Sequence, residues 1–183
     1  MIFGPSPADW AAVPSEGILT MTPVTGGEDM SITQSGYDEW HAVPAPSTNS
    51  SIVVQGDVQF VAGGSDNAIG IGCVNGTTTT QLGFHVFEDK TWTLAYYPPG
   101  NGEMQDLDSG SSVAIRSTNL VNSLTVSCVA SGAGTQVMAA VNGVTVVNDV
   151  ASVPSTNWDP SMDQCSCDGA DTGRFTNISL FSP

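Results

Sequence analysis

Two carboxylates at alternate positions, Asp106 and Asp108 in the stretch MQDLDSG, have a spacing that suggests chemistry. Hydrolysis of a glycosidic bond needs two carboxyl groups flanking it, and a retaining pair stands about 5 Å apart, which alternate residues of one strand supply. The surrounding residues, PPGNGEMQDLDSGSS, have the composition of a loop, where carboxylates are ordinarily solvated. A Gly-x-Ser-x-Gly nucleophile motif is absent. We therefore expect this protein not to be an enzyme.

Four aromatic side chains are candidate ligand contacts, because aromatic rings offer an apolar surface beside which polar groups fix orientation. Trp92, Tyr96 and Tyr97 lie in TWTLAYYPPG beside a turn. Along a strand, Trp92 and Tyr96 share one face and Tyr97 lies on the other, so at least one must point inward. Trp158 is flanked by turn-forming residues in PSTNWDPSMD, which predicts a surface loop. Trp158 is the preferred contact.

Four aspartates crowd the same stretch, which is also predicted to be a loop: Asp159, Asp163, Asp168 and Asp171. Carboxylate oxygens are the ligands that calcium prefers, so this segment is a candidate calcium site. The spacing does not reproduce an EF-hand, and solvated loop acids are the alternative. No other cofactor is expected.

The four cysteines, Cys73, Cys128, Cys165 and Cys167, allow three full pairings. Cys73 ends AIGIGC and Cys128 lies in SLTVSC, both strand-like, so neighbouring strands could bring the two sulfurs together. We expect a Cys73–Cys128 disulfide. Cys165 and Cys167 would then form a small ring across one residue, or stay a free pair or a metal site. An even cysteine number and an acidic surface suit an oxidising, extracellular compartment.

The charge of the chain excludes some partners. Three cations stand against 18 carboxylates, giving a net charge of -15, so no basic surface exists for nucleic acid or anionic membrane. No apolar stretch reaches the roughly 18 residues of a membrane span. The start, MIFGPSPADW, lacks the basic region of a signal peptide, so either a leader was removed before Met1 or this is an excised domain. We expect an excised domain, with a longer, membrane-anchored chain as one option for its parent.

Short apolar runs separated by Pro and Gly predict strands throughout. In QVMAAVNGVTVVNDV the Asn142-Gly143 pair suits a type I′ turn and predicts a β-hairpin. Helical periodicity is almost absent. We therefore expect one antiparallel, all-β sandwich over residues 1–183, with 1–17 an irregular lead-in. Further strands are predicted at ILTMT, MSIT, YDEWHAV, SIVVQGDVQFV, AIGIGCV, LGFHVFE, TWTLAYY, SVAI, SLTVSCVA and RFTNISLF.

The order of these runs over residues 51–150 resembles the lectin-like jelly-roll domains of the concanavalin A/laminarinase superfamily, especially bacterial extracellular modules attached to membrane serine/threonine kinases. The matching features are a strand ending Gly-x-x-Cys, a second Cys before a Gly turn, and a Val-Asn-Gly hairpin followed by Asp. They fall on Cys73, Cys128, Asn142, Gly143 and Asp149. The family's closing Gly-x-x-Gly turn is absent, and the N-terminal part has no matching motif.

The resemblance implies binding of carbohydrate or cell-envelope material on a concave sheet or at the loop rim. The superfamily also includes glycoside hydrolases that carry Glu-x-Asp-x-x-Glu, a motif missing here. We expect a non-catalytic extracellular recognition or sensor module. A structural or adhesive surface domain is the alternative, and a glycoside hydrolase-like enzyme is third.

Overall fold

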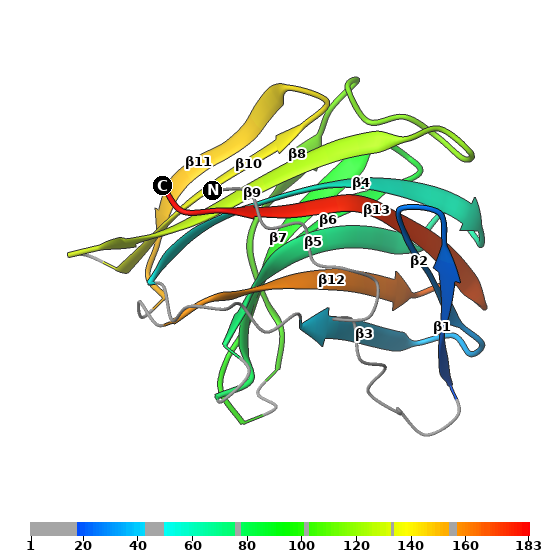
Figure 1. Ribbon diagram of the computed structural model, residues 1–183, viewed down its shortest axis with the longest axis horizontal. Coiled ribbons are helices and arrows are strands. Elements are labelled where there is room, and N and C mark those ends of the chain that lie inside the picture. Colours follow the sequence, from blue (N-terminus) through cyan, green and yellow to red (C-terminus); the bar gives the residue numbers. More distant parts are fainter. Residues whose placement is uncertain (1–17, 43–49, 76–77, 101–102, 133, 154–156) are drawn as a thin grey trace.

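The computed structural model describes residues 18–42, 50–75, 78–100, 103–132, 134–153 and 157–183. These residues form two antiparallel sheets packed face to face (Figure 1). In spatial order, the seven-stranded sheet consists of β1 (Leu19–Val24), β2 (Gly27–Ile32), β13 (Asp171–Phe181), β4 (Ser51–Ala62), β9 (Asn122–Ser131), β10 (Gly134–Val141) and β11 (Val144–Ala151). The six-stranded sheet consists of β3 (Tyr37–Ala42), β12 (Asp159–Ser166), β5 (Ala68–Asn75), β6 (Thr80–Phe87), β7 (Thr91–Tyr97) and β8 (Gln105–Ser111).

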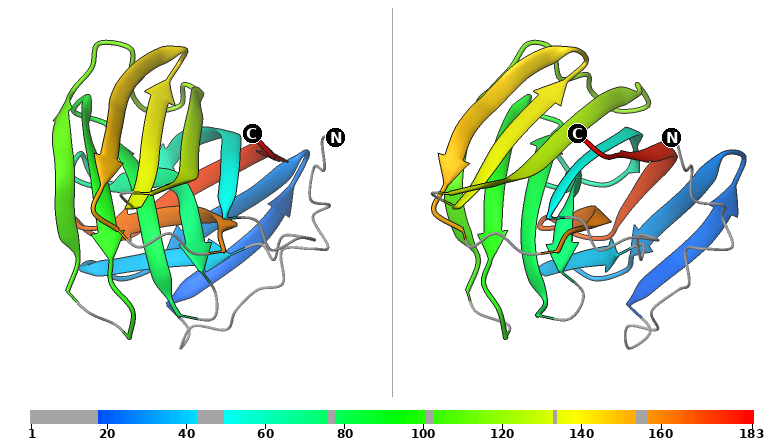
Figure 2. Two further views of the ribbon diagram at one scale, coloured as in Figure 1. Left: turned by 90° about the vertical axis from the view of Figure 1, so that its left-hand side faces the viewer. Right: turned by 60° about the vertical axis from the view of Figure 1, so that its left-hand side comes forward.

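This architecture confirms the predicted antiparallel sandwich, and Figure 2 shows the two layers from two further sides. Apolar side chains at alternate positions of both sheets meet between the layers and form the core. The described part of the chain contains no helix long and apolar enough to span a membrane.

The predicted hairpin at Asn142-Gly143 joins β10 to β11. Both turn residues have positive φ, 49° and 80°, as a type I′ turn requires. The Asn142 side chain also tethers the turn, because its Nδ2 donates to the Ala114 carbonyl at 2.7 Å and its Oδ1 accepts from the Ser123 amide at 2.9 Å. Local turn chemistry and tertiary contacts therefore agree at this point.

The Cys73–Cys128 disulfide is present, with both residues fully buried. It joins β5 of the six-stranded sheet to β9 of the seven-stranded sheet, so it crosses the core. The prediction of the pairing was correct, but the expected geometry of neighbouring strands was wrong.

Three predicted segments differ from the structure. The stretches around Gln105–Ser111 and Asp159–Ser166 were expected to be loops, yet they are strands β8 and β12. β12 lies between β3 and β5, and this tertiary pairing outweighs its loop-like composition. Conversely, the predicted strand SVAI has its centre in a turn at residues 113–114, after β8 has ended.

Candidate ligand-binding face

The outer face of the six-stranded sheet, which points away from the core, carries an unusual set of polar residues. On β6, Leu82, Phe84 and Val86 enter the core, so the alternating residues Gln81 and His85 lie on the outer face. Strand pairing extends this face across the sheet. Asp163 on β12 is opposite both Gly70 on β5 and Trp40 on β3, Gly70 is opposite His85, and Gln81 is opposite Tyr97 on β7.

Glycines form the floor beneath these side chains. A Cβ on Gly72 would lie 2.9 Å from the Asp163 Oδ2 atom. A Cβ on Gly83 would lie 3.2 Å from His85 Nε2 and 3.3 Å from Asp163 Oδ2. The imidazole and the carboxyl group therefore approach the same point above Gly83 from two sides, and only residues without a side chain leave room for them.

Asp163 is fully buried although it lies on the outer face. Its carboxyl group accepts hydrogen bonds from Gln81 Nε2 and, at 3.4 Å, from Ser161 Oγ. Burial raises the pKa of Asp163 well above its ordinary value of 3.8, and the negative charge of Asp38 raises it further. Burial and the neighbouring charge therefore both favour the neutral form of the Asp163 carboxyl group.

His85 is 4% exposed, and its Nε2 atom has no hydrogen-bond partner among the described residues. Burial lowers the pKa of His85, while the negative charges of Asp38 and Asp106 partly oppose that effect. The imidazole is therefore neutral near pH 7. The Oε1 atom of Gln81 is likewise buried without a hydrogen-bond partner in the described part of the chain.

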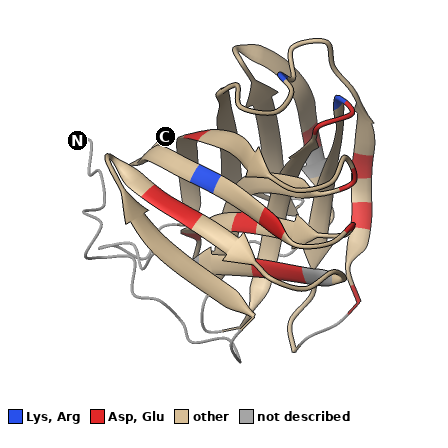
Figure 3. Cartoon of the chain, turned by 90° about the vertical axis from the view of Figure 1, so that its right-hand side faces the viewer, with Lys and Arg blue, Asp and Glu red and all other residues tan. Residues whose placement is uncertain are grey.

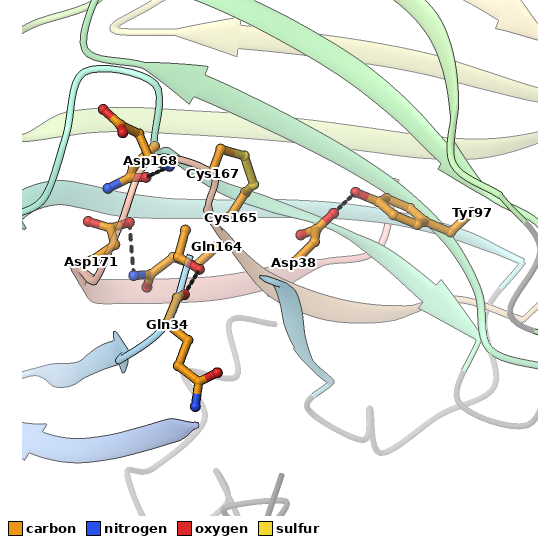
Figure 4. The surroundings of a disulfide bond; sticks show 10 residues. Gln34, Asp38, Tyr97, Gln164, Cys165, Cys167, Asp168 and Asp171 are labelled. Carbon is orange, nitrogen blue, oxygen red and sulfur yellow. Dashed lines mark hydrogen bonds between the residues drawn. A yellow bond between two sulfur atoms is a disulfide. The ribbon is translucent and has the colours of Figure 1, made fainter. Parts of the chain in front are cut away.

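A side-chain bridge crosses this face. The Tyr97 hydroxyl on β7 donates to the Asp38 carboxylate on β3, although β6, β5 and β12 separate these two strands (Figure 4). Burial raises the pKa of Tyr97, and the charge of Asp38 adds to this effect, so the phenol stays protonated. We name Asp38, Gln81, His85, Tyr97 and Asp163 the polar cluster.

Of the four predicted aromatic contacts, only Tyr97 joins this cluster. Trp158 is fully buried in the core and Trp92 is 6% exposed, while Tyr96 packs against the same core. The prediction of a surface loop at Trp158 is wrong, because strand β12 begins immediately after it and directs the indole inward. The prediction that Trp92 and Tyr96 share a face opposite Tyr97 is confirmed.

The four aspartates of the predicted calcium site do not come together. Asp163 bonds with Gln81 and Ser161 on the outer face, whereas Asp171 accepts a hydrogen bond from Gln164 Nε2 at 3.0 Å. Asp159 is at the far end of β12 from Asp168. Across the described ranges, no group of three or more His, Cys, Asp or Glu side chains is arranged to hold a metal ion. These four acids are close in the sequence because strand β12 is followed by a turn, and they do not form a metal site.

Asp171 itself is 3% exposed, and burial raises its pKa from 3.8 to about 6. It lies near the disulfide that Cys165 and Cys167 form with each other, one of the alternatives expected for this pair (Figure 4). Asp168 follows that disulfide, and its backbone amide donates to Asn67 Oδ1 at 2.9 Å.

The pair Asp106 and Asp108 lies on the exposed edge strand β8 rather than in a loop. A register shift in β8 leaves Asp106 opposite Ala95 and Asp108 opposite Leu94, which are consecutive residues of β7. Leu94 and Ala95 point to opposite faces of the sheet, and Leu94 enters the core. Asp106 and Asp108 therefore lie opposite residues of different faces and do not form a pair on one face.

Sequence reasoning did not identify Asp38, Trp40, Gln81 or His85 as members of this face, and it considered Asp163 only as a calcium ligand. Trp40 is partly exposed and lies directly opposite Asp163. The available signal was the glycine alternation in AIGIGC and LGF, since glycines at alternate strand positions mark a close approach by other groups.

No family model matches the sequence, and no curated protein matches it. Solved structures match its fold. The carbohydrate binding module CBM66 from Bacillus subtilis has a TM-score of 0.68 and 14% identity, over 90% of this chain and 92% of that chain. Alginate lyase vAL-1 from Chlorella virus has a TM-score of 0.59 and 12% identity, over 90% and 89% of the two chains. A structure described as a native glycosidic hydrolase has a TM-score of 0.61 and 9% identity, over 92% and 84%.

These identities show the fold alone, and that fold occurs in both binding modules and enzymes. None of the three structures is described as part of a membrane kinase. The chain is therefore an antiparallel jelly-roll sandwich with a polar cluster on the outer face of its six-stranded sheet.

Proposed function

We propose that this protein is a carbohydrate-binding domain that holds a saccharide on the outer face of its six-stranded sheet. The observation that carries the proposal is the polar cluster, in which His85 Nε2 and Gln81 Oε1 are buried without partners in the described residues. The partly exposed rings of Trp40 and Tyr97 belong to the same face. Aromatic surface beside a few fixed polar groups is the usual composition of a small-ligand site. The fold shared with a carbohydrate binding module supports this proposal.

Binding is tested with a soluble glycan array followed by calorimetry on each ligand found. Trp40→Ala should weaken binding about tenfold, equivalent to about 1.4 kcal/mol. Met138→Ala is the matched control, because Met138 is also partly exposed but lies on β10 of the other sheet. Equal affinity of the Trp40 variant and wild type for every ligand would exclude this face as the site.

We propose further that the site binds without cleaving its ligand. The carboxyl group of Asp163 already accepts hydrogen bonds from Gln81 and Ser161, so it is engaged within the cluster and is not free as one of the two carboxyl groups that glycoside hydrolysis needs. The enzymes among the matched structures favour catalysis as the alternative. Incubation of bound oligosaccharides with protein at pH 4–8, analysed by mass spectrometry, should show no cleavage. Cleavage that disappears in Asp163→Asn would establish an enzyme.

The two disulfides are the reason to propose a secreted or surface location, since such bonds persist in oxidising compartments. Labelling of free thiols in protein isolated from its natural host would find both pairs protected. A structural surface domain without a ligand is the competing function, and the array distinguishes the two.

A further inference from the structure

We infer that the polar cluster selects uncharged saccharides and disfavours those that carry uronic, sialic or sulfate groups. This inference rests on the proposed function, because it names the ligand class of the same face. It follows from three separate features of that face: where the cations lie, where the carboxylates lie, and which hydrogen-bonding atoms remain free.

Two of the chain's three cations are held by other groups outside the cluster, and the third lies in a turn. Arg174 on β13 of the other sheet donates to Asp29 at 2.7 and 2.8 Å. Arg116 donates to the Val121 carbonyl at 3.0 Å in the segment before β9. Lys90 occupies the turn between β6 and β7. Recognition of carboxylate or sulfate ordinarily uses an arginine fork or a lysine, and no arginine or lysine belongs to the polar cluster.

The nearest charges are negative instead. Asp38 and Asp106 are exposed, and the charge of each acts on both His85 and Tyr97, so they lie within electrostatic reach of the cluster. The whole chain has 18 Asp and Glu residues against three Lys and Arg, and Figure 3 marks their positions in the described parts. An anionic group placed about 6 Å from one such carboxylate, at an effective dielectric constant of about 40, loses roughly tenfold in affinity.

The free atoms suit hydroxyl groups. Gln81 Oε1 can only accept a hydrogen bond, and Nε2 of the neutral His85 ring accepts or donates according to its tautomer. A sugar hydroxyl can donate to the first atom and pair with the second in either tautomer. An ionised carboxylate or sulfate has no proton to donate, so that group itself cannot pair with Gln81 Oε1.

The test is an array that presents neutral oligosaccharides beside their uronic, sialylated or sulfated counterparts on the same backbones. Wild-type protein should bind neutral members at least tenfold more tightly than their acidic counterparts. Asp38→Asn keeps an oxygen that can accept from Tyr97 but removes a charge, and it should reduce that preference to threefold or less. Asp57→Asn makes the same change in net charge on β4 of the other sheet and should leave the preference unchanged.

Acidic members bound as tightly as neutral ones, with binding lost in His85→Ala, would overturn the inference and leave the proposed function standing. An equal shift in Asp38→Asn and Asp57→Asn would also overturn it, since the preference would then come from net charge alone. Binding of no saccharide would remove the proposed function together with the inference.

Discussion

The buried Asp171 should make the protein less stable at neutral pH than at pH 4.5. Its pKa is about 6 in the folded state and 3.8 as an ordinary carboxyl group. Below pH 3.8 both the folded and the unfolded chain bind the proton, so this group has no effect on stability. Between the two values the folded state binds more protons, and the free energy of unfolding therefore falls as the pH rises.

The size of this effect follows from the shift. One pKa unit corresponds to 1.36 kcal/mol, so Asp171 lowers the free energy of unfolding by up to about 3 kcal/mol above pH 6. Asp163 and Glu28, whose pKa values are also raised by burial, act in the same direction. Asp171→Asn retains an oxygen acceptor for Gln164 and removes this titration, so it should reduce the pH dependence by about 3 kcal/mol and leave the part that comes from Asp163 and Glu28.

Urea unfolding followed by tryptophan fluorescence between pH 4 and pH 8 measures this directly. The matched control is Asp66→Asn, an exposed aspartate whose loss of charge should leave the pH dependence as in wild type. A pH profile of Asp171→Asn that is parallel to wild type would show that the buried carboxyl group does not control stability.

Three further predictions concern the core and the bridge. Cys73→Ala/Cys128→Ala should lower the free energy of unfolding by about 4 kcal/mol, because this disulfide closes a loop of 55 residues. Cys165→Ala/Cys167→Ala should lower it far less, because that disulfide spans a sequence separation of only 2. Equal losses of stability in urea unfolding would contradict the loop-entropy reasoning. Trp158→Ala should lower stability by about 3–5 kcal/mol as a core truncation, and an unchanged melting temperature would show that the indole is not packed. Tyr97→Phe removes the bridge to Asp38 and should speed diethyl pyrocarbonate modification of His85, measured by peptide mass spectrometry; an unchanged rate would mean that the bridge does not cover the cluster.

The sequence was sufficient to predict most strands, because turn residues and alternating apolar residues act locally. Asn142-Gly143 specified its own hairpin, and the two strand-borne cysteines specified their pairing. β12 was missed because its polar residues Ser161, Asp163 and Gln164 are buried by neighbouring strands, a condition that composition cannot express.

The candidate site was harder to predict for the same reason. Its members come from β3, from the consecutive strands β6 and β7, and from β12, three parts of the chain that are far apart in sequence and share one sheet through strand pairing. Of the four aromatic residues predicted as contacts, only Tyr97 lies on the outer face, because the other three pack in or against the core. Trp158 illustrates this difficulty. Turn-forming residues beside it predict an irregular backbone, but they do not predict the direction of its side chain, which is fully buried.

The disulfide between Cys73 and Cys128 also has a mechanical consequence. When a domain is pulled from its two ends, only the chain outside this covalent loop can extend. The 55-residue separation therefore withholds about 190 Å of contour length, at about 3.5 Å per residue. The hidden segment includes β6, β7 and β8, which together carry Gln81, His85 and Tyr97. Under tension, half of the candidate binding sheet would thus stay within the closed loop while the flanking strands were extended.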